Sequence, residues 1–411
     1  MYEHLEQMSP FYPSERLTDL AIELIEKSSA LEGRVASRTA RSIAELMLHA
    51  NSYYSNLIEG QHTRPLEVEA NLRNPAKTKN ELVELGTAHI RTEQAARDKA
   101  ENGESPYDLH FILWLHKHFY DRLPDSMKVV KGEKKTGNVI PGEWRQEDVE
   151  VGQHVAPKYQ AIPELMKEFV ELYRPVNNKA VTLTRIAAAH HRFVWIHPFL
   201  DGNGRVGRLL THAWLRAAGV MGTGLWSISR GLARNREAYL ARLQNADQPR
   251  QGDLDGRGNL SLRALDEFCE FVLKTAIDQV EYMRDSFGLH TLEHRLQRAF
   301  AEFAISIPGI REEGWRLVKE AINQGEFERG DASRITGLGE RVARDLLSSL
   351  IDHALLVSDS PRGRKVYATF PVRAVSWYFP ELFPPGDVLE YSKGLDIDSK
   401  QSAAHKIPIA R

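Results

Sequence analysis

The sequence predicts a mainly α-helical protein with more than one domain. Apolar residues recur at helical spacing along most of the chain, and the strict apolar–polar alternation of strands is scarce. A chain of 411 residues also exceeds what one hydrophobic core usually serves. Two short stretches, one in the middle and one near the C-terminus, have the composition of β-hairpins.

The first hundred residues predict three helices, at 16–36, 39–60 and 78–100. Five apolar residues are expected to share one face of the first helix: Leu17, Leu20, Ile22, Leu24 and Ile25. The second helix is predicted to stop near Gly60, and the third ends before a break near residue 105. We therefore expect an N-terminal helical region over residues 1–105.

A central domain is expected over residues 106–288. Glycine, proline and asparagine interrupt short β-prone pieces at 131–152, which predicts a hairpin. Helical spacing governs the rest of this domain. The predicted helices are at 108–123, 161–175, 183–199, 205–219, 235–247 and 261–287.

Residues 289–385 are expected to form a separate module. Three helices, with a tight turn between the last two, precede two strands around a basic tip. That order is typical of a winged helix-turn-helix. The remaining residues, 386–411, are expected to be a loosely ordered tail.

Composition excludes several classes of protein. The net charge of −2 argues against general binding to a polyanion. The single cysteine, Cys269, excludes an internal disulfide framework. No stretch approaches eighteen apolar residues, and the first residues lack a signal-peptide pattern. We expect a cytoplasmic protein that does not enter a membrane.

The stretch HPFLDGNGRVGR, residues 197–208, carries the most chemistry. Gly202, Gly204 and Gly207 permit a backbone turn with exposed amides just before and inside the start of a helix. The first N–H groups of a helix are unpaired and lie at its positive end, so they bind anions. This part of the motif predicts a phosphate site.

Charged residues around this turn indicate which reaction it supports. Arg205 and Arg208 are neighbours on the helix surface and suit a polyphosphate. Asp201 is compatible with such anions if Mg²⁺ joins it. His197 is the one group here that accepts a proton near neutral pH. These residues together predict nucleotidyl or phosphoryl transfer from a Mg²⁺-bound nucleotide.

The stretch resembles the signature of Fic-domain proteins, His-x-Phe-x-Asp/Glu-Gly-Asn-Gly/Lys-Arg-x-x-Arg, at every fixed position. The resemblance implies a helical Fic core and transfer of AMP from ATP to a Ser, Thr or Tyr hydroxyl of a protein. It makes His197 the general base and Asp201 the Mg²⁺ ligand. The phosphates are expected to contact the segment that continues from Asp201: Gly202, Asn203, Gly204, Arg205, Val206, Gly207 and Arg208.

The resemblance also indicates which group is transferred. Relatives that act as kinases have lysine at the position of Gly204, so glycine there favours AMP transfer over phosphate transfer. Relatives that transfer phosphocholine share the motif, and that alternative stays open.

Further nucleotide contacts are expected outside the motif. The predicted hairpin resembles the flap of Fic proteins, which pairs with a target segment, and Val149, Val151 and Gly152 are expected at its nucleotide-facing end. The segment 235–247 resembles the helix beside the adenine, with Tyr239 and Asp247 near the base or ribose. Leu240 departs from the family pattern, in which many relatives have a second aromatic residue.

The segment SNLIEG, residues 55–60, resembles the inhibitory motif of the same family. A carboxylate at Glu59 can pair bidentately with Arg208 and withhold it from the γ-phosphate, and Ser55 lies one turn earlier on the same face. This predicts self-inhibition, within one chain or across a homodimer. In some relatives this glutamate also helps to remove AMP from the target, and the sequence leaves that activity open.

A second class of function competes with the enzyme. In it the winged helix binds DNA and the Fic core senses a nucleotide. Basic residues of the module that could contact phosphates are Arg341, Arg344, Arg362, Arg364 and Lys365. A docking role for this module fits equally well. His197 favours the enzyme, because a sensor needs the anion site without the base. For the enzyme, the resemblance implies a protein with a free hydroxyl as the acceptor, and this chain itself qualifies.

Overall fold

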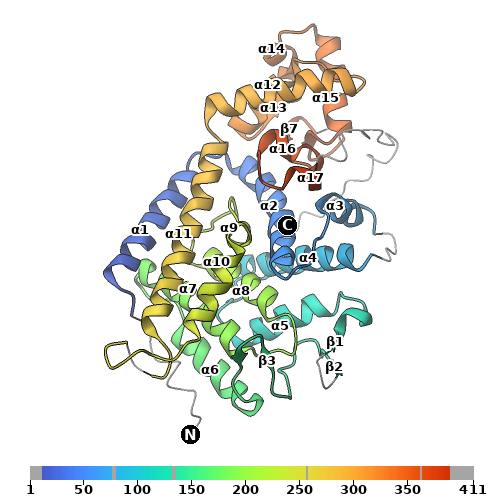
Figure 1. Ribbon diagram of the computed structural model, residues 1–411. Helices are drawn as coiled ribbons and strands as arrows, with labels where there is room; N and C mark the ends of the chain where they lie inside the picture. Colours follow the sequence, from blue (N-terminus) through green and yellow to red (C-terminus); the bar gives the residue numbers. More distant parts are fainter. Residues whose placement is uncertain (1–11, 76–79, 132–135, 256–257, 362, 389–411) are drawn as a thin grey trace. The chain divides into compact units, whose positions relative to one another are not determined.

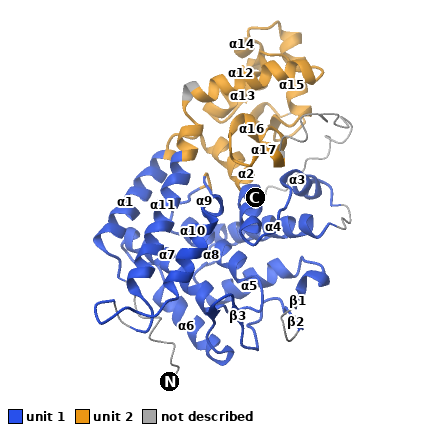
Figure 2. Cartoon of the chain, viewed as in Figure 1, with its two compact units in different colours: residues 1–30, 48–222, 226–281 blue, residues 31–47, 223–225, 282–411 orange. Residues whose placement is uncertain are grey.

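The computed structural model is dominated by helices (Figure 1), which confirms the predicted fold class. It describes residues 12–75, 80–131, 136–255, 258–361 and 363–388. Contacts divide the chain into two compact units (Figure 2). Unit 1 comprises residues 1–30, 48–222 and 226–281, and unit 2 comprises residues 31–47, 223–225 and 282–411. Neither unit is one continuous piece of chain.

Unit 1 is built mainly from helices. They are α1 (Glu15–Glu32), α2 (Ser37–Ile58), α3 (Pro65–Arg73), α4 (Glu81–Glu101), α5 (Leu109–Tyr120), α6 (Ile162–Leu172), α7 (Lys179–Ile196), α8 (Asn203–Ala217), α9 (Ile228–Arg234), α10 (Arg236–Ala246) and α11 (Leu262–Ser286). The first turns of α2 and the last residues of α11 belong to unit 2. Among the described residues, no helix is both long and apolar enough to cross a membrane.

The buried face of α1 differs in part from the predicted one. Leu17, Ala21 and Leu24 are fully buried, whereas 44% of Ile22 is exposed. Ile22 lies two positions from Leu24, and residues two apart on a helix do not share a face. The prediction for Ile22 was therefore wrong.

Helices α7 and α8 form the centre of unit 1. Most residues of α7 are buried, including the three consecutive alanines that end at Ala189. Gly207 of α8 lies against α7, since a Cβ there would come within 3.1 Å of the Phe193 ring. Small side chains thus allow close packing of the two helices that flank the motif.

The β structure of unit 1 consists of two small antiparallel hairpins. Strand β1 (Val129–Lys131) pairs with β2 (Thr136–Asn138), and β3 (Glu150–Val151) pairs with β4 (His154–Val155). The single hairpin predicted over 131–152 was wrong in its extent. The segment between the two ladders contains Arg145, which is buried.

Unit 2 combines helices with a three-stranded antiparallel sheet of order β5-β7-β6. Its elements are α12 (Leu289–Ser306), α13 (Gly314–Gln324), β5 (Phe327–Glu328), α14 (Ala332–Thr336), α15 (Glu340–Asp352), β6 (Leu356–Ser358), β7 (Lys365–Ala368), α16 (Val375–Tyr378) and α17 (Pro385–Val388). The succession from α13 to β7 has the order that is typical of a winged helix-turn-helix. The sequence analysis did not predict helix α12. Arg362 and the tail residues 389–411 lie outside the described residues.

The first turns of α2 are bound within unit 2. The buried Thr39 hydroxyl donates to the Ile322 carbonyl at 2.8 Å. The Arg38 guanidinium lies 3.8 Å from the centre of the Tyr367 ring and pairs with Asp359. This helix therefore contributes to both units.

Candidate active site

His197 lies at the end of α7 in a backbone conformation that is uncommon outside glycine. Its φ of 50° and ψ of 59° are left-handed, and its N–H donates to the Phe193 carbonyl at 3.2 Å. This residue thus ends α7 and turns the chain into the loop that leads to α8. Such a conformation outside glycine is common at functional sites.

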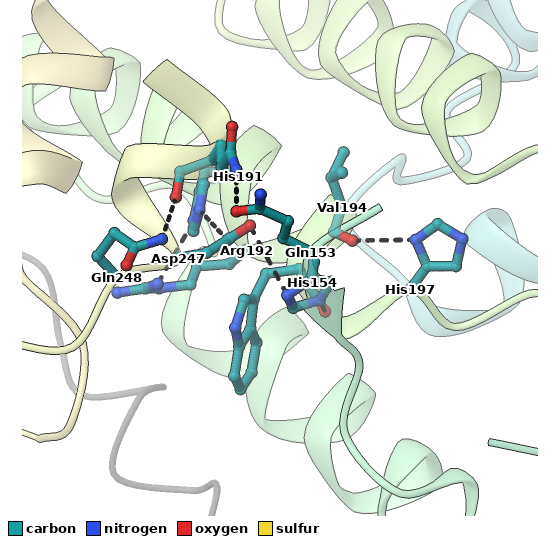
Figure 3. Close-up of polar contacts among 10 residues, drawn as sticks. Gln153, His154, His191, Arg192, Val194, His197, Asp247 and Gln248 are labelled. Atoms are coloured by element: carbon teal, nitrogen blue, oxygen red, sulfur yellow. Dashed lines mark hydrogen bonds and ion pairs between the residues drawn. The ribbon is translucent and has the colours of Figure 1, made fainter. Parts of the chain in front are cut away.

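The hydrogen bonds of His197 define its tautomer. Nδ1 lies 3.3 Å from the Val194 carbonyl. Figure 3 marks this contact with a dashed line. A carbonyl can only accept, so Nδ1 carries the proton and Nε2 holds a lone pair. Burial lowers the pKa of His197 to about 4, and the nearby Arg145 charge makes a smaller contribution to that shift. The imidazole is therefore neutral at physiological pH and able to act as a base.

The loop between His197 and α8 is rigidly held. The Asn203 side chain accepts from the Phe199 N–H at 2.9 Å and donates to the Phe199 carbonyl at 2.8 Å. The buried Phe199 ring stacks on His116 with centroids 3.8 Å apart. The Phe199 ring thus packs inward, and Asn203 closes the loop with its side chain.

Asp201 is held by two residues of α5. The Tyr120 hydroxyl donates to Asp201 Oδ2 at 2.7 Å, and His116 Nε2 donates to the Asp201 carbonyl at 3.3 Å. His116 Nδ1 accepts from the Gly142 N–H at 2.9 Å. Burial lowers the pKa of His116 to about 4, in agreement with a neutral ring that has both nitrogens engaged.

The N-terminus of α8 lies where the sequence predicts an anion site. Gly202 precedes the helix with a φ of 82°, and a Cβ there would collide with the Tyr120 ring. The Gly202 carbonyl accepts from the Val206 N–H, so the N–H groups of residues 203–205 have no partner within the helix. These amides can bind an anion.

Arg208, the second arginine of the motif, is bound by the end of α2. Its Nη2 lies 2.6 Å from Glu59 Oε1 and 2.9 Å from the Ser55 carbonyl, and Nε donates to the Ser55 hydroxyl at 2.9 Å. Arg208 is buried, whereas the Glu59 side chain is 33% exposed. The structure thus brings together the three residues that the sequence paired. The contact differs in detail, because one carboxylate oxygen and Ser55 replace the expected bidentate pair.

Arg205 is bound by neighbouring residues of the same segment. Its Nε donates to Asn56 Oδ1 at 3.0 Å, and Nη2 donates to Gln61 Oε1. Arg205 and Asn56 are both buried. Both motif arginines are therefore engaged by residues 55–61.

The charge of Glu59 is maintained by these arginines. Burial raises the pKa of its carboxyl, but Arg208 and then Arg205 outweigh that effect and hold the pKa below its ordinary value. A Cβ added to Gly204 would collide with Glu59 Oε1, so the carboxylate lies against the start of α8.

The second hairpin is fastened to α7 and to Asp247, the residue that follows α10. Figure 3 shows Asp247 between His191 and His154. Asp247 Oδ1 accepts from His191 Nε2 at 2.8 Å, Oδ2 lies 3.7 Å from His154 Nδ1, and His154 Nε2 donates to the Trp195 carbonyl at 2.7 Å. Val151 is 46% exposed beside Gly152, whose φ is 62°. The Val149 carbonyl accepts from the Ala156 N–H at 3.3 Å and extends the hairpin.

Tyr239 lies in a buried position. Only 2% of it is exposed, and its hydroxyl lies 2.8 Å from His190 Nε2. The structure thus places Tyr239 in the packing behind Arg208, while Leu240 on the same helix is 39% exposed. A direct contact of Tyr239 or Asp247 with a nucleotide stays a prediction.

Several residues of the site escaped the sequence analysis. Tyr120, His116, Asn56, Gln61 and Arg145 all contact the motif or the inhibitory segment. Each lies far from the motif in sequence. The sequence could have identified Asn56 as a site residue. It is a polar residue adjacent to Ser55 and one turn before Gly60, in a helix otherwise rich in apolar residues.

Comparisons with known proteins find relatives of the part of the chain that contains the motif 197–208. Residues 106–215 match the Fic/DOC family. A probable protein adenylyltransferase of Aquifex aeolicus is 31% identical over 156 residues, which are 38% of this chain and 42% of that protein. The protein adenylyltransferase Fic of Drosophila mojavensis is 40% identical over 109 residues, which are 26% of this chain and 21% of that protein. The chain thus spans less than half the length of either relative.

The fold has a counterpart among solved structures. A crystal structure of a Fic family protein from Desulfovibrio desulfuricans aligns with 88% of this chain and 98% of its own, with a TM-score of 0.50. The sequences are 19% identical, so this likeness concerns the fold alone.

Proposed function

Residues 106–215 of the chain are a Fic domain, and from this premise we propose that the protein transfers AMP from ATP to a hydroxyl group of a protein. The observation that carries the proposal is the neutral His197, with Nε2 available as an acceptor, one loop before an unpaired helix N-terminus. The names of two relatives, both protein adenylyltransferases, support it.

In the proposed reaction the acceptor oxygen attacks the α-phosphorus of ATP. The bond from that phosphorus to the bridging oxygen of the β-phosphate breaks, and pyrophosphate leaves with the electron pair. His197 Nε2 takes the proton of the hydroxyl. The N–H groups at the start of α8, with Arg205 and Arg208, stabilise the phosphate charge.

The residues present fit a magnesium ion. Asp201 is partly exposed, and Tyr120 occupies one of its carboxylate oxygens, which leaves acceptor capacity on the other. Among the described residues no group of three or more acidic, histidine or cysteine side chains could hold a metal by itself. Mg²⁺ needs only one or two carboxylates when phosphates supply other ligands. When bound, it would neutralise phosphate charge and favour departure of pyrophosphate.

The contacts of residues 55–61 support self-inhibition as part of the proposal. Glu59 and Ser55 engage Arg208, and Asn56 and Gln61 engage Arg205, so neither guanidinium is free for a phosphate. Removal of the Glu59 carboxylate would take away the charged partner of Arg208 and empty the space beside Gly204. The same carboxylate, released from Arg208, is also a candidate for orienting a water in AMP removal.

The test uses ATP labelled on the α-phosphate. The wild-type protein, Glu59→Gly and Glu59→Gly/His197→Ala are each incubated with Mg²⁺, with and without bacterial lysate. We expect label on protein with Glu59→Gly, much less with the wild type and none with the double variant. ATP labelled on the γ-phosphate is the control, and it should label nothing if AMP is the group transferred.

Other outcomes would redirect the proposal. Label from the γ-phosphate alone would indicate phosphate transfer. No label from either nucleotide, in any variant, would reject AMP transfer and leave the phosphocholine alternative and the sensor alternative.

The DNA-binding alternative depends on exposed basic residues of unit 2. Arg341 and Arg344 are exposed on α15, and Arg364 is exposed at the start of the segment that leads into β7. Asp345, also exposed, reduces the local positive charge. Salt-dependent retention of a DNA duplex by the full chain, lost in Arg341→Ala/Arg344→Ala, would support this alternative.

A further inference from the structure

Arg145 is a buried arginine whose side-chain hydrogen bonds to described residues all go to backbone carbonyls. It is 4% exposed. Nε donates to the His197 carbonyl at 2.8 Å, Nη1 to the Glu147 carbonyl at 2.7 Å and Nη2 to the Pro157 carbonyl at 2.5 Å. It forms no ion pair with any residue that the structure describes. Burial of a guanidinium without a carboxylate partner costs free energy, which its hydrogen bonds to carbonyls offset in part.

The three acceptors belong to two parts of the site. Glu147 and Pro157 flank the hairpin of β3 and β4, one on each side. The third acceptor is the carbonyl of His197 itself. The planar fork of one arginine thus ties both ends of the hairpin to the residue that carries the base.

The backbone beside Arg145 adds to this connection. The Arg145 N–H donates to the Pro198 carbonyl at 2.9 Å, and the adjacent Trp144 ring lies 4.9 Å from the Phe199 ring. The left-handed backbone of His197 directs its carbonyl toward Arg145 instead of along α7. Arg145 therefore holds a strained residue in place.

We propose that Arg145 is a positioning residue that sets the hairpin of residues 147–157 relative to His197, so that a protein segment docked on the hairpin presents its hydroxyl to the base. This inference rests on the proposed function. Strand addition fixes a docked segment relative to the hairpin, and Arg145 fixes the hairpin relative to the histidine. A displacement of about 1 Å between acceptor and base is enough to slow transfer about a hundredfold.

Two variants distinguish a positioning role of the Arg145 side chain from an effect of its charge alone. Arg145→Lys keeps the positive charge near His197 but cannot bridge three carbonyls, whereas Arg145→Gln removes the charge as well. Arg295→Lys is the matched control. It changes a half-buried arginine of unit 2 that donates to the Ser286 carbonyl. All three are made in the Glu59→Gly background and checked by thermal unfolding.

The first measurement is amide hydrogen exchange followed by mass spectrometry, which needs no activity. With Arg145→Lys we expect exchange in peptides covering residues 147–157 and 194–200 to accelerate about tenfold or more, with little change elsewhere. Arg295→Lys should leave both peptides unchanged. Unchanged exchange in Arg145→Lys would overturn the inference even if the protein proves to be an adenylyltransferase.

The second measurement compares nucleotide binding with transfer. Calorimetry with Mg-ATP should give an affinity for Arg145→Lys within about twofold of the parent, while transfer of the α-label falls about tenfold to a hundredfold. Full transfer by Arg145→Lys, with a loss only in Arg145→Gln, would show that charge alone matters and would reject positioning. If the Glu59→Gly parent itself transfers no label, the proposed function fails, and the exchange experiment still decides the role of Arg145.

Discussion

At the scale of single residues, the two motif arginines are held by different partners. Arg208 has a carboxylate and Arg205 has two neutral side-chain amides, Asn56 and Gln61. A hydrogen bond between two charged groups is stronger than one to a neutral acceptor. The contacts of Arg208 and Arg205 should therefore contribute unequally to inhibition. The family signature draws attention to Glu59, and the structure adds Asn56.

We predict that Asn56→Ala raises basal AMP transfer, but less than Glu59→Gly does. Loss of the bond to Arg205 Nε is expected to weaken the hold on this arginine by about 1 kcal/mol, or about fivefold in rate. The measurement is the initial rate of α-label transfer. Asn51→Ala is the control, because Asn51 lies on the same helix and donates to Glu93 instead of contacting the motif. Equal activation by both variants would point to general loosening of α2.

At the scale of elements, the start of α8 depends on one glycine. Gly202 combines a φ of 82° with a Cβ position that Tyr120 already occupies. Gly103 has a similar φ of 87° but nothing within 4 Å of its Cβ position. The two glycines therefore separate the cost of backbone strain from the cost of a steric collision.

We predict that Gly103→Ala lowers the free energy of unfolding by about 1–2 kcal/mol, the cost of a left-handed residue. Gly202→Ala should lower it further, because Tyr120 must move and its hydrogen bond to Asp201 is lost. Urea unfolding of both variants measures the difference. An equal loss of unfolding free energy in the two variants would show that Tyr120 moves aside without a cost in stability.

Sequence periodicity predicted long helices well and short elements poorly. Helix α11, predicted at 261–287, is observed at Leu262–Ser286, because its apolar spacing persists over many turns. The strands β1 to β4 have two or three residues each, too few for a pattern, so their pairing was not predictable. Of the site, residues 197–208 were evident in one short segment, whereas Tyr120 and Arg145 meet them only through tertiary packing.

At the scale of the whole molecule, several histidines are buried in neutral form. Burial lowers the pKa of His89 and His190 to about 3, and that of His116 and His197 to about 4. Neither ring nitrogen of His89 has a hydrogen-bond partner among the described residues. In the unfolded chain these groups would titrate near their ordinary pKa of about 6.5.

We predict that the protein loses stability as the pH falls from about 6.5 toward 4. In that range the unfolded chain binds protons that the folded protein does not, so each of these histidines lowers the free energy of unfolding by up to about 1.4 kcal/mol per pH unit. Urea midpoints at pH 8.5, 7.5, 6.0 and 5.0 measure the effect. We expect the first two to agree and the last two to decline. A midpoint independent of pH would contradict neutral burial.

The residues that hold the motif arginines also precede them in the chain, with Glu59 lying 149 positions before Arg208. Translation proceeds from the N-terminus, so the restraining segment leaves the ribosome before the catalytic helix does. If residues 55–61 inhibit as proposed, each newly made molecule acquires its restraint before its catalytic site. The newly synthesised protein would then be inhibited, and a later event would be needed to activate it.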